Sequence, residues 1–219
     1  YLLAGASLLP LLAVPLMRDT YPALPERQVA AGTASGRLKP AVALLVIFSL
    51  YLFIGAIWAF LEPIGAQSGI DAATVGIIVS TSLLVQVFGA MSATWLEPRL
   101  HYRSVIGGAA FVAVLIGIGF ASDPSAGLFW VLSLATGFLW LFVVPWQISM
   151  SVDADPGRKA ALLVPAAQLF GAAIGPAGAS AFIVAGDVRP VAWFAAACAL
   201  ASLLLLISLV LMNHRRKGH

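Results

Sequence analysis

Residues 55–63 of the chain read GAIWAFLEP, and residues 137–145 read GFLWLFVVP. The two segments share Gly, Trp, Phe and Pro at the same four positions, at an offset of 82 residues. At this offset two further matches occur: Asp71-Ala72 with Asp153-Ala154, and Gln86-x-Phe88-Gly89-Ala90 with Gln168-x-Phe170-Gly171-Ala172. Matches of Ala and Leu arise easily by chance in an apolar chain, but paired Trp, Pro, Asp and Gln do not. The pattern indicates an internal repeat, with chance similarity as the alternative.

Both copies belong to a chain of 219 residues that is 61% hydrophobic and only 10% charged. Soluble domains carry about 25% charged residues. Nine acidic and twelve basic residues cannot cover the surface of a water-soluble body of this size. The composition therefore predicts an all-α integral membrane protein whose main partner is the lipid bilayer, and it argues against soluble enzymes and nucleic-acid-binding modules.

The hydrophobic residues form runs whose lengths match a membrane. A bilayer core about 30 Å thick is crossed by about 20 helical residues. Six runs are long enough to be full transmembrane helices: 41–67, 72–95, 104–122, 127–150, 160–185 and 190–212. Residues 1–17 are apolar but shorter, and we interpret them as a partial transmembrane helix, with a signal peptide as the alternative. Residues 18–40 are predicted to be a cytoplasmic linker, and residues 41–219 a six-helix bundle.

The Lys and Arg residues indicate the orientation of these helices. Eleven of the twelve lie in the linker 18–40, in the loops near 96–103 and 151–159, or in the C-terminal tail, and the intervening loops carry only Arg189. Positively charged loops stay on the cytoplasmic side. We therefore expect these four segments, including the C-terminus, to be cytoplasmic in a multi-pass protein of the plasma membrane, in a bacterium the inner membrane.

The offset of the repeat relates helices of opposite direction. It maps the first full span onto the fourth and the second onto the fifth, so that three spans separate each pair and the copies cross the membrane in opposite senses. The predicted fold is a 3+3 inverted repeat, with copies at about 41–122 and 123–212. Inverted repeats are frequent in secondary transporters, which bind substrate near the midplane between the copies, although channels and structural proteins also contain repeats.

The chain resembles the C-terminal half of a major facilitator superfamily transporter. The segment Trp95-Leu96-Glu97-Pro98-Arg99-Leu100-His101-Tyr102-Arg103 is similar to the cytoplasmic signature after helix eight of that family, with Pro98 in place of the usual Asp and His101 in place of Gly. Asp155-Pro156-Gly157-Arg158-Lys159-Ala160 is similar to the connection before helix eleven. The resemblance implies a missing N-terminal six-helix half and a cytoplasmic gate that includes Arg99, Arg103 and Arg158.

Polar, small and aromatic residues recur at helical spacing in the two copies. The first stripe consists of Tyr51, Gly55, Trp58, Glu62 and Gly65, and its repeat mates are Ser133, Gly137, Trp140, Val144 and Gln147. In the resembled family these two helices line the central cavity, so the resemblance implies a transport cavity here. The alternative is close helix packing, for which small and aromatic residues are also used.

Glu62 is the strongest candidate for a functional carboxylate, because its repeat mate Val144 shows that the scaffold does not require a carboxylate at this position. An ionisable residue in a membrane span is costly and indicates function. Twenty residues beyond Val42, at about 1.5 Å each, it is predicted near the outer boundary. We weigh proton coupling or substrate binding against a hydrated interfacial role.

Gln86 and Gln168 are predicted at mid-span, where an amide requires hydrogen-bond partners. They either bind substrate or bond to a neighbouring helix. Gly171, Gly175 and Pro176 permit close helix approach and a kink. They partly resemble a Gly-Pro motif of drug/proton antiporters, and packing is the simpler interpretation. The loop acids are interpreted as solvated turn or capping residues: Asp71, Asp123, Asp153, Asp155 and Asp187.

Together these features favour a proton-coupled secondary transporter of small organic solutes, with amphipathic or aromatic molecules suiting a cavity lined by Trp, Tyr and amides. Two other classes stay open: an intramembrane enzyme, and a membrane scaffold or receptor that does not transport. No enzyme activity, cofactor or metal is expected, because the predicted spans hold no His and no pairing of a nucleophile with a base.

Overall fold

The computed structural model of the chain describes residues 34–155 and 157–215. Apart from one isolated antiparallel bridge between Val184 and Asp187, the regular elements of this part are α-helices. The predicted partial helix 1–17 and residues 18–33 of the predicted linker lie outside it. The eight helices of the described part are α2 (Ala34–Ala59), α3 (Leu61–Gln67), α4 (Ala72–Leu96), α5 (Tyr102–Ala121), α6 (Ala126–Phe142), α7 (Val144–Ala154), α8 (Lys159–Ser180) and α9 (Arg189–Arg215).

Five of these helices are long and apolar enough to cross a membrane, and the pair α6 and α7 is a sixth candidate if both belong to one span. The prediction of an all-α, multi-pass membrane protein is therefore confirmed, with five to six candidate spans in the described part. Helix α2 begins at Ala34, within the segment predicted as linker, and Pro40 lies inside it.

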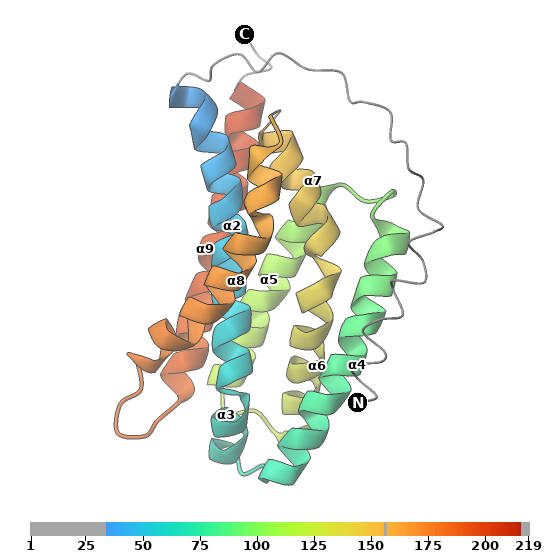
Figure 1. Cartoon of the computed structure of the whole chain (residues 1–219). Coiled ribbons are helices and arrows are strands. Elements are labelled where there is room, and N and C mark those ends of the chain that lie inside the picture. Colours follow the sequence, from blue (N-terminus) through green and yellow to red (C-terminus); the bar gives the residue numbers. More distant parts are fainter. Residues whose placement is uncertain (1–33, 156, 216–219) are drawn as a thin grey trace, which may run out of the picture. The chain divides into compact units, whose positions relative to one another are not determined.

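Successive spans run antiparallel, so that alternate connections lie together (Figure 1). One end of the bundle, here called the basic end, holds the start of α2, the end of α9 and the connections 97–101 and 155–158. The opposite end holds the connections 68–71, 122–125 and 181–188. The loops rich in Lys and Arg thus share one end of the bundle, as the alternation of charge along the sequence predicts.

Two spans are interrupted next to a proline. A turn at Phe60 separates α2 from α3, and a turn at Val143 separates α6 from α7, whose axes are bent by 45°. Pro63 and Pro145 follow these turns, and a proline has no N–H to donate to the carbonyl one helical turn earlier. The two prolines are repeat equivalents, so the breaks fall at nearly matching places of the two sequence copies.

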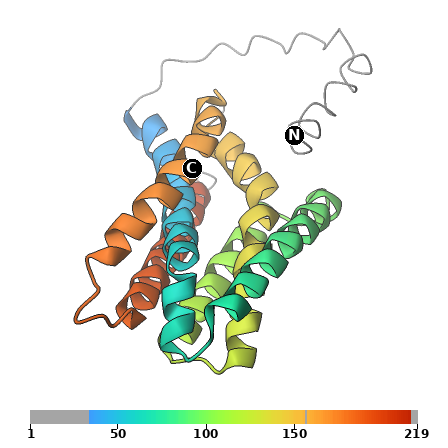
Figure 2. The same ribbon diagram turned by 60° about the horizontal axis from the view of Figure 1, so that its bottom comes forward.

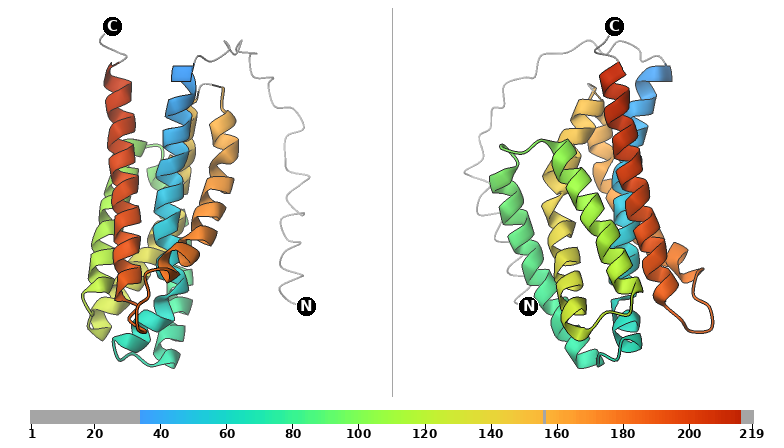
Figure 3. Two further views of the ribbon diagram at one scale, coloured as in Figure 1. Left: turned by 90° about the vertical axis from the view of Figure 1, so that its left-hand side faces the viewer. Right: turned by 180° about the vertical axis from the view of Figure 1, so that it is seen from behind.

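The helices pack in pairs, as the views in Figures 2 and 3 show: α2 lies along α8 and α9, α5 along α9, and α4 along α6. Glycines make the closest approaches. A Cβ added at Gly89 of α4 would lie 2.5 Å from the carbonyl oxygen of Phe138, and one added at Gly171 of α8 would lie 2.6 Å from that of Phe48. These repeat-equivalent glycines remove side chains where backbones must come close.

Helices α4 and α8 are the most exposed spans. In an apolar segment of 18 residues within each helix, only 22% of the residues are buried, against 67% for the corresponding segment of α2. Their outward faces carry large apolar side chains, among them the repeat mates Phe88 and Phe170, which are 62% and 63% exposed. Helices α5 and α9 hold few polar residues, and 50% and 39% of the residues in their corresponding segments are buried. Such apolar faces suit lipid or another helical unit.

One loop acid caps the start of a helix, as the capping interpretation expects, and a second one follows α7 and accepts hydrogen bonds from the turn before α8 and from its first residues. Asp71 accepts hydrogen bonds from the backbone nitrogen of Thr74 (2.9 Å) and from its hydroxyl (2.7 Å), ahead of α4. These bonds hold the pKa of Asp71 below its ordinary value, because they favour the ionised carboxylate. Asp155 accepts from the nitrogens of Gly157 (3.0 Å) and Ala160 (2.9 Å) ahead of α8.

Candidate functional site

An aromatic pair joins the two sequence copies. The rings of Trp58 in α2 and Trp140 in α6 meet edge to face, with centroids 5.5 Å apart and an interplanar angle of 86°. Both tryptophans lie one to three residues before the turn that ends their helix. An aromatic edge-to-face contact contributes about 0.5–1.5 kcal/mol beyond area burial, and each tryptophan is only partly buried, so ring surface is left for another molecule.

Tyr51 connects α2 to the break between α6 and α7. Its side chain is buried, and its hydroxyl donates a hydrogen bond to the backbone carbonyl of Trp140 (3.2 Å). The ladder of backbone bonds is interrupted just beyond Trp140, where carbonyls lose their usual partners. Tyr51 therefore satisfies a carbonyl at the end of α6 and fixes the bend relative to α2.

Two glutamines meet beside this region. Gln147 of α7 is fully buried, and its Oε1 accepts a hydrogen bond of 2.7 Å from Nε2 of Gln168 in α8. The bond ties α7 to α8, which is one of the two roles considered for Gln168. The Nε2 atom of Gln147 is buried and has no partner among the described residues.

Gln86 of α4 presents the same situation, because its Nε2 is also buried without a partner in the described part. A buried amide N–H that makes no hydrogen bond costs about 1–3 kcal/mol. An unpaired buried donor of this kind calls for an explanation, and an acceptor on a bound water, ion or ligand is one. The arrangement can therefore bind an acceptor oxygen or nitrogen of a ligand.

Other members of the predicted stripes lie in helix contacts. A Cβ added at Gly137 would lie 2.7 Å from the carbonyl oxygen of Ser82, and Gly55 is packed against the backbone of Ala172 even more closely. Ser133 is buried and donates to the carbonyl of Phe129 in its own helix (2.8 Å). In the described structure these three positions serve packing and internal bonding, next to the aromatic and amide groups.

Three residues of α8 were singled out for packing or a kink. A Cβ added at Gly175 would lie 2.5 Å from the carbonyl oxygen of Leu52, so Gly175 lies against α2 together with Gly171. Pro176 lies inside α8, which runs without interruption from Lys159 to Ser180. The glycines thus bring α8 onto α2.

Glu62 lies on the first turn of α3, at the end opposite the basic loops, and its side chain is exposed. Its place near the outer boundary of the membrane, expected from counting residues, stays a prediction. Gly65, the next member of the stripe, is buried against the side chains of Val75 and Phe129. The structure therefore places Glu62 apart from the glutamine pair of α7 and α8.

The loop after α4 and the first residue of α5 are bonded to α7 at the basic end. Three hydrogen bonds join them: Ser149 Oγ to Glu97 Oε1 (3.0 Å), Trp146 Nε1 to Leu100 O (3.1 Å) and Tyr102 Oη to Asp153 Oδ2 (2.6 Å). Sequence reasoning treated Asp153 as a solvated turn or capping residue. Its side chain is exposed, as that interpretation expects, but the residue lies in the last turn of α7 and its carboxylate accepts from the buried Tyr102 of α5.

Asp153 also connects the ends of α2 and α9. Asn213 donates to Asp153 (3.5 Å) and accepts from Nζ of Lys39 (2.6 Å). Of the predicted gate residues, Arg103 donates from Nε to the hydroxyl of Tyr102 (3.4 Å) and so lies beside this network.

The other two gate candidates lie elsewhere. Arg99 stacks over the Trp95 ring at 4.3 Å from its centroid and donates to the Trp95 carbonyl. Arg158 is exposed and has a left-handed backbone conformation (φ 57°) just before α8. The three arginines share one end of the bundle, and only Arg103 contacts the network around Asp153.

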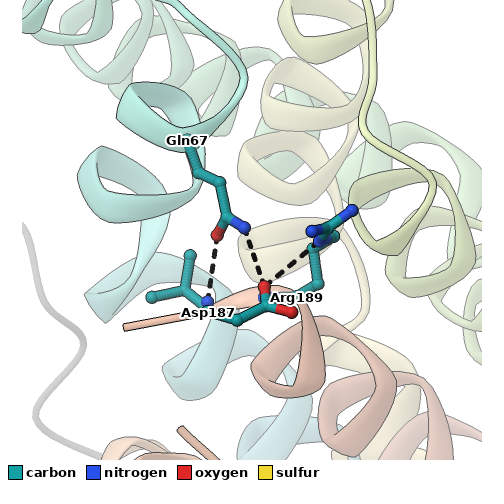
Figure 4. A network of polar contacts seen from close by, with 4 residues as sticks. Gln67, Asp187 and Arg189 are labelled. Carbon is teal, nitrogen blue, oxygen red and sulfur yellow. Dashed lines mark hydrogen bonds and ion pairs between the residues drawn. The ribbon is translucent and has the colours of Figure 1, made fainter. Parts of the chain in front are cut away.

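A second polar cluster, here called the opposite-end clasp, joins α3 to the connection before α9 (Figure 4). Gln67 donates from Nε2 to Asp187 Oδ1 (2.7 Å) and accepts from the backbone nitrogen of Val188 (2.9 Å), while Arg189 pairs with Asp187 at 3.1 Å. The Gln67 bond, followed by the bonds from Arg189, lowers the pKa of Asp187. Sequence reasoning did not single out Gln67.

The geometry defines the class of this protein: a helical multi-pass membrane protein with buried amides and paired aromatic residues beside two helix breaks. The chain matches no protein-family model, no curated protein and no solved structure at a significant level.

Proposed function

We propose that the chain forms one six-helix half of a secondary transporter that moves small organic solutes by alternating access, coupled to protons. The observation that carries this proposal is the pair of proline-associated helix breaks at repeat-equivalent places. Interrupted helices that flank a central site are typical of transporters built from inverted repeats. The proposed repeats are α2 to α5 and α6 to α9, within a fold of the major facilitator type.

The packing of the helices supports an inverted repeat. An exchange of the two copies converts the contact of α2 with α8 into the contact of α6 with α4, and both contacts are extensive. The breaks are also exchanged: α3 lies at the opposite end and α7 towards the basic end. Alternating access then follows from rocking of the proposed half against its partner half, for which the exposed apolar faces of α4 and α8 are suited.

The solute binds between the aromatic pair and the amides. Trp58 and Trp140 offer partly exposed ring faces, which favour aromatic or amphipathic molecules. The unpartnered Nε2 atoms of Gln147 and Gln86 are donors for an acceptor group of the solute. Binding there replaces the hydrogen bonds that these amides lack, which supplies orientation as well as affinity.

Glu62 carries the proton in this proposal. It is a carboxylate at the end opposite the basic loops, and its repeat mate Val144 has no charge. Proton binding and release at Glu62 then accompany each transport cycle. The basic end faces the cytoplasm under the positive-inside rule.

The test is solute-driven proton movement in proteoliposomes that contain a trapped pH-sensitive dye. Aromatic and amphipathic solutes are added one at a time, with and without an imposed pH gradient. The complete twelve-helix protein is expected to move protons with at least one solute, whereas the chain alone is expected to bind without transport. Quenching of tryptophan fluorescence in the detergent-solubilised chain measures the binding. Because the chain holds six tryptophans, a Trp58→Phe, Trp140→Phe double variant identifies the part that comes from these two.

Two variants separate proton coupling from general damage. Glu62→Gln is expected to abolish the pH dependence of uptake. Asp71→Asn changes another exposed carboxylate at the same end, keeps a good helix cap and is expected to transport normally. Unchanged uptake and pH dependence in Glu62→Gln would refute the role of Glu62, and the absence of both binding and uptake for every solute would refute the transporter proposal.

A further inference from the structure

An open groove of about 200 Å³ runs between α5 and α9 near the basic end. The two helices lie side by side there, as the rear view in Figure 3 shows. The residues that line the groove are Arg103, Gly107, Leu203, Leu206, Ile207, Val210 and Leu211. Six of these seven are apolar, and the single charged one belongs to the first turn of α5.

The depth of the groove follows from the direction of the helices. Helix α5 starts at the basic end and α9 finishes there, so Arg103 lies near Val210 and Leu211, while Gly107 and Leu203 lie farther into the apolar part of the bundle. The groove therefore has a cationic mouth and an apolar interior, arranged along the membrane normal. Its shape and polarity match a molecule with an anionic head and a hydrocarbon chain.

The guanidinium of Arg103 is available to such a head. Among the described residues the only ion pair within 4.0 Å joins Arg189 to Asp187, so Arg103 has no carboxylate partner there. Its Nε donates to the hydroxyl of Tyr102 at 3.4 Å, a long bond. The acid nearest to it in the network, Asp153, already accepts from Tyr102 and Asn213.

We propose that this groove binds one anionic phospholipid, with its phosphate on Arg103 and one acyl chain between α5 and α9. The hydrocarbon of a bilayer is as apolar as the leucine side chains of the groove, so the acyl chain by itself gives a lipid no preference for the groove over the bilayer. Selection has to come from the head, because a cationic side chain at the membrane surface attracts anionic lipid. This inference requires a membrane-embedded bundle and is independent of transport.

Gly107 provides the space for the acyl chain. A Cβ added there would lie 3.5 Å from Cδ2 of Leu206, in ordinary contact, and Leu206 is itself a lining residue of the groove, so a side chain at position 107 enters the groove. Gly108 is the next residue, is exposed and has no atom within 4 Å of an added Cβ. The two glycines therefore form a matched pair for substitution.

The test measures lipid binding to the detergent-solubilised chain by native mass spectrometry. The probes are dioleoylphosphatidylglycerol and dioleoylphosphatidylcholine, which share acyl chains and differ in head charge. The chain is expected to bind one molecule of phosphatidylglycerol about fivefold more tightly, the effect of one cationic side chain at the surface. Arg103→Gln is expected to remove this preference, Arg103→Lys to keep most of it, and Arg99→Gln to leave it unchanged.

Substitution of the glycines tests the acyl-chain site. Gly107→Leu is expected to weaken the binding of both lipids, and Gly108→Leu to bind like the unaltered chain. Soluble glycerol phosphate is expected not to compete, because it lacks the acyl chain; full competition would show a phosphate site and overturn the proposal. So would an unchanged preference in Arg103→Gln. If Arg103→Gln or Gly107→Leu loses its cooperative thermal transition, Arg103→Lys and Gly108→Leu still test the proposal. Loss of the preference for phosphatidylglycerol in either of these two would contradict the proposed contact.

Discussion

At the level of single residues, buried amides matter through polar atoms that need partners, whereas glycines matter through the absence of a side chain. Gln147 is fully buried with one polar atom satisfied and one unpartnered in the described structure. Gln168, its partner, is only partly buried. The glycines of α8 contribute by the absence of a side chain, which allows two backbones to touch. Both kinds of residue make measurable predictions.

The Gln147–Gln168 bond predicts an asymmetry between two near-isosteric substitutions. Gln168→Met leaves Gln147 with both polar atoms unpaired in a buried place and is expected to lower the free energy of unfolding by about 1–3 kcal/mol. Gln147→Met removes the buried amide together with its unpartnered Nε2 and leaves only the Nε2 of the partly buried Gln168 without its acceptor, so a smaller cost, below about 1 kcal/mol, is expected. Unfolding titrations in detergent measure both; equal losses would contradict the asymmetry.

Gly175 predicts a clash. Gly175→Ala places a Cβ 2.5 Å from the carbonyl oxygen of Leu52 and 3.0 Å from the nitrogen of Ala56, so α8 must move away from α2. An overpacked helix contact costs about 1–3 kcal/mol, and a fall in melting temperature is expected. Gly76→Ala is the control, since an added Cβ there meets no atom within 4 Å and the higher helix propensity of Ala favours it.

At the level of elements, the interrupted spans are the features that distinguish this bundle from a set of straight helices. Each break is followed by a proline, and the hydroxyl of Tyr51 satisfies a carbonyl at the second one. The short helix α3 beyond the first break is anchored by the opposite-end clasp. The breaks and the clasp are separable by substitution.

Pro145→Ala restores a backbone N–H at the bend of 45° between α6 and α7. The bend is expected to decrease, which lengthens the distance between spin labels at Gly127 and Ile148 in a Cys198→Ala background. Pro165→Ala is the control, because Pro165 lies inside the uninterrupted α8. An unchanged distance in Pro145→Ala would show that packing and the Tyr51 bond, and not the proline, maintain the bend.

The opposite-end clasp predicts a dependence on pH. The ionised Asp187 accepts from Gln67, and its lowered pKa means that this contribution is complete above the ordinary value of 3.8. It is lost as pH falls through the lowered pKa of the folded state. The difference in melting temperature between the unaltered chain and Gln67→Ala should therefore shrink as pH falls below that value. Part of the difference remains in acid, because the bond from the backbone nitrogen of Val188 to Gln67 does not titrate. A difference that stays the same size or grows in acid would contradict the role of the carboxylate.

At the level of the whole molecule, the gathering of basic loops at one end predicts that this end faces the cytoplasm. Single cysteines at Ser122 and Lys159, in a Cys198→Ala background, report the two ends, because both side chains are exposed. An impermeant maleimide is expected to label Ser122→Cys in intact cells and Lys159→Cys only after permeabilisation. The reverse pattern would invert the proposed topology.

The approximate positions and the alternation of the long helices follow from the sequence alone, because the bilayer imposes a minimum apolar length and charged loops remain outside it. The predicted run 72–95 became α4 (Ala72–Leu96), and 190–212 lies within α9, whereas the runs 41–67 and 127–150, predicted as single spans, are each divided between two helices. The sequence alone also shows that Pro63 and Pro145 match at the offset of 82 residues.

Only the tertiary structure decided which side chains meet. Helices that are apolar all round show no stripe that reveals their rotation, so the pairing of Gln147 with Gln168, the bond from Tyr51 to Trp140 and the groove beside Arg103 could not be predicted. For the same reason Gly55 and Gly137 could be either cavity or packing positions until their neighbours were known. Periodicity reports the environment of one helix, whereas a site depends on the crossing and register of several.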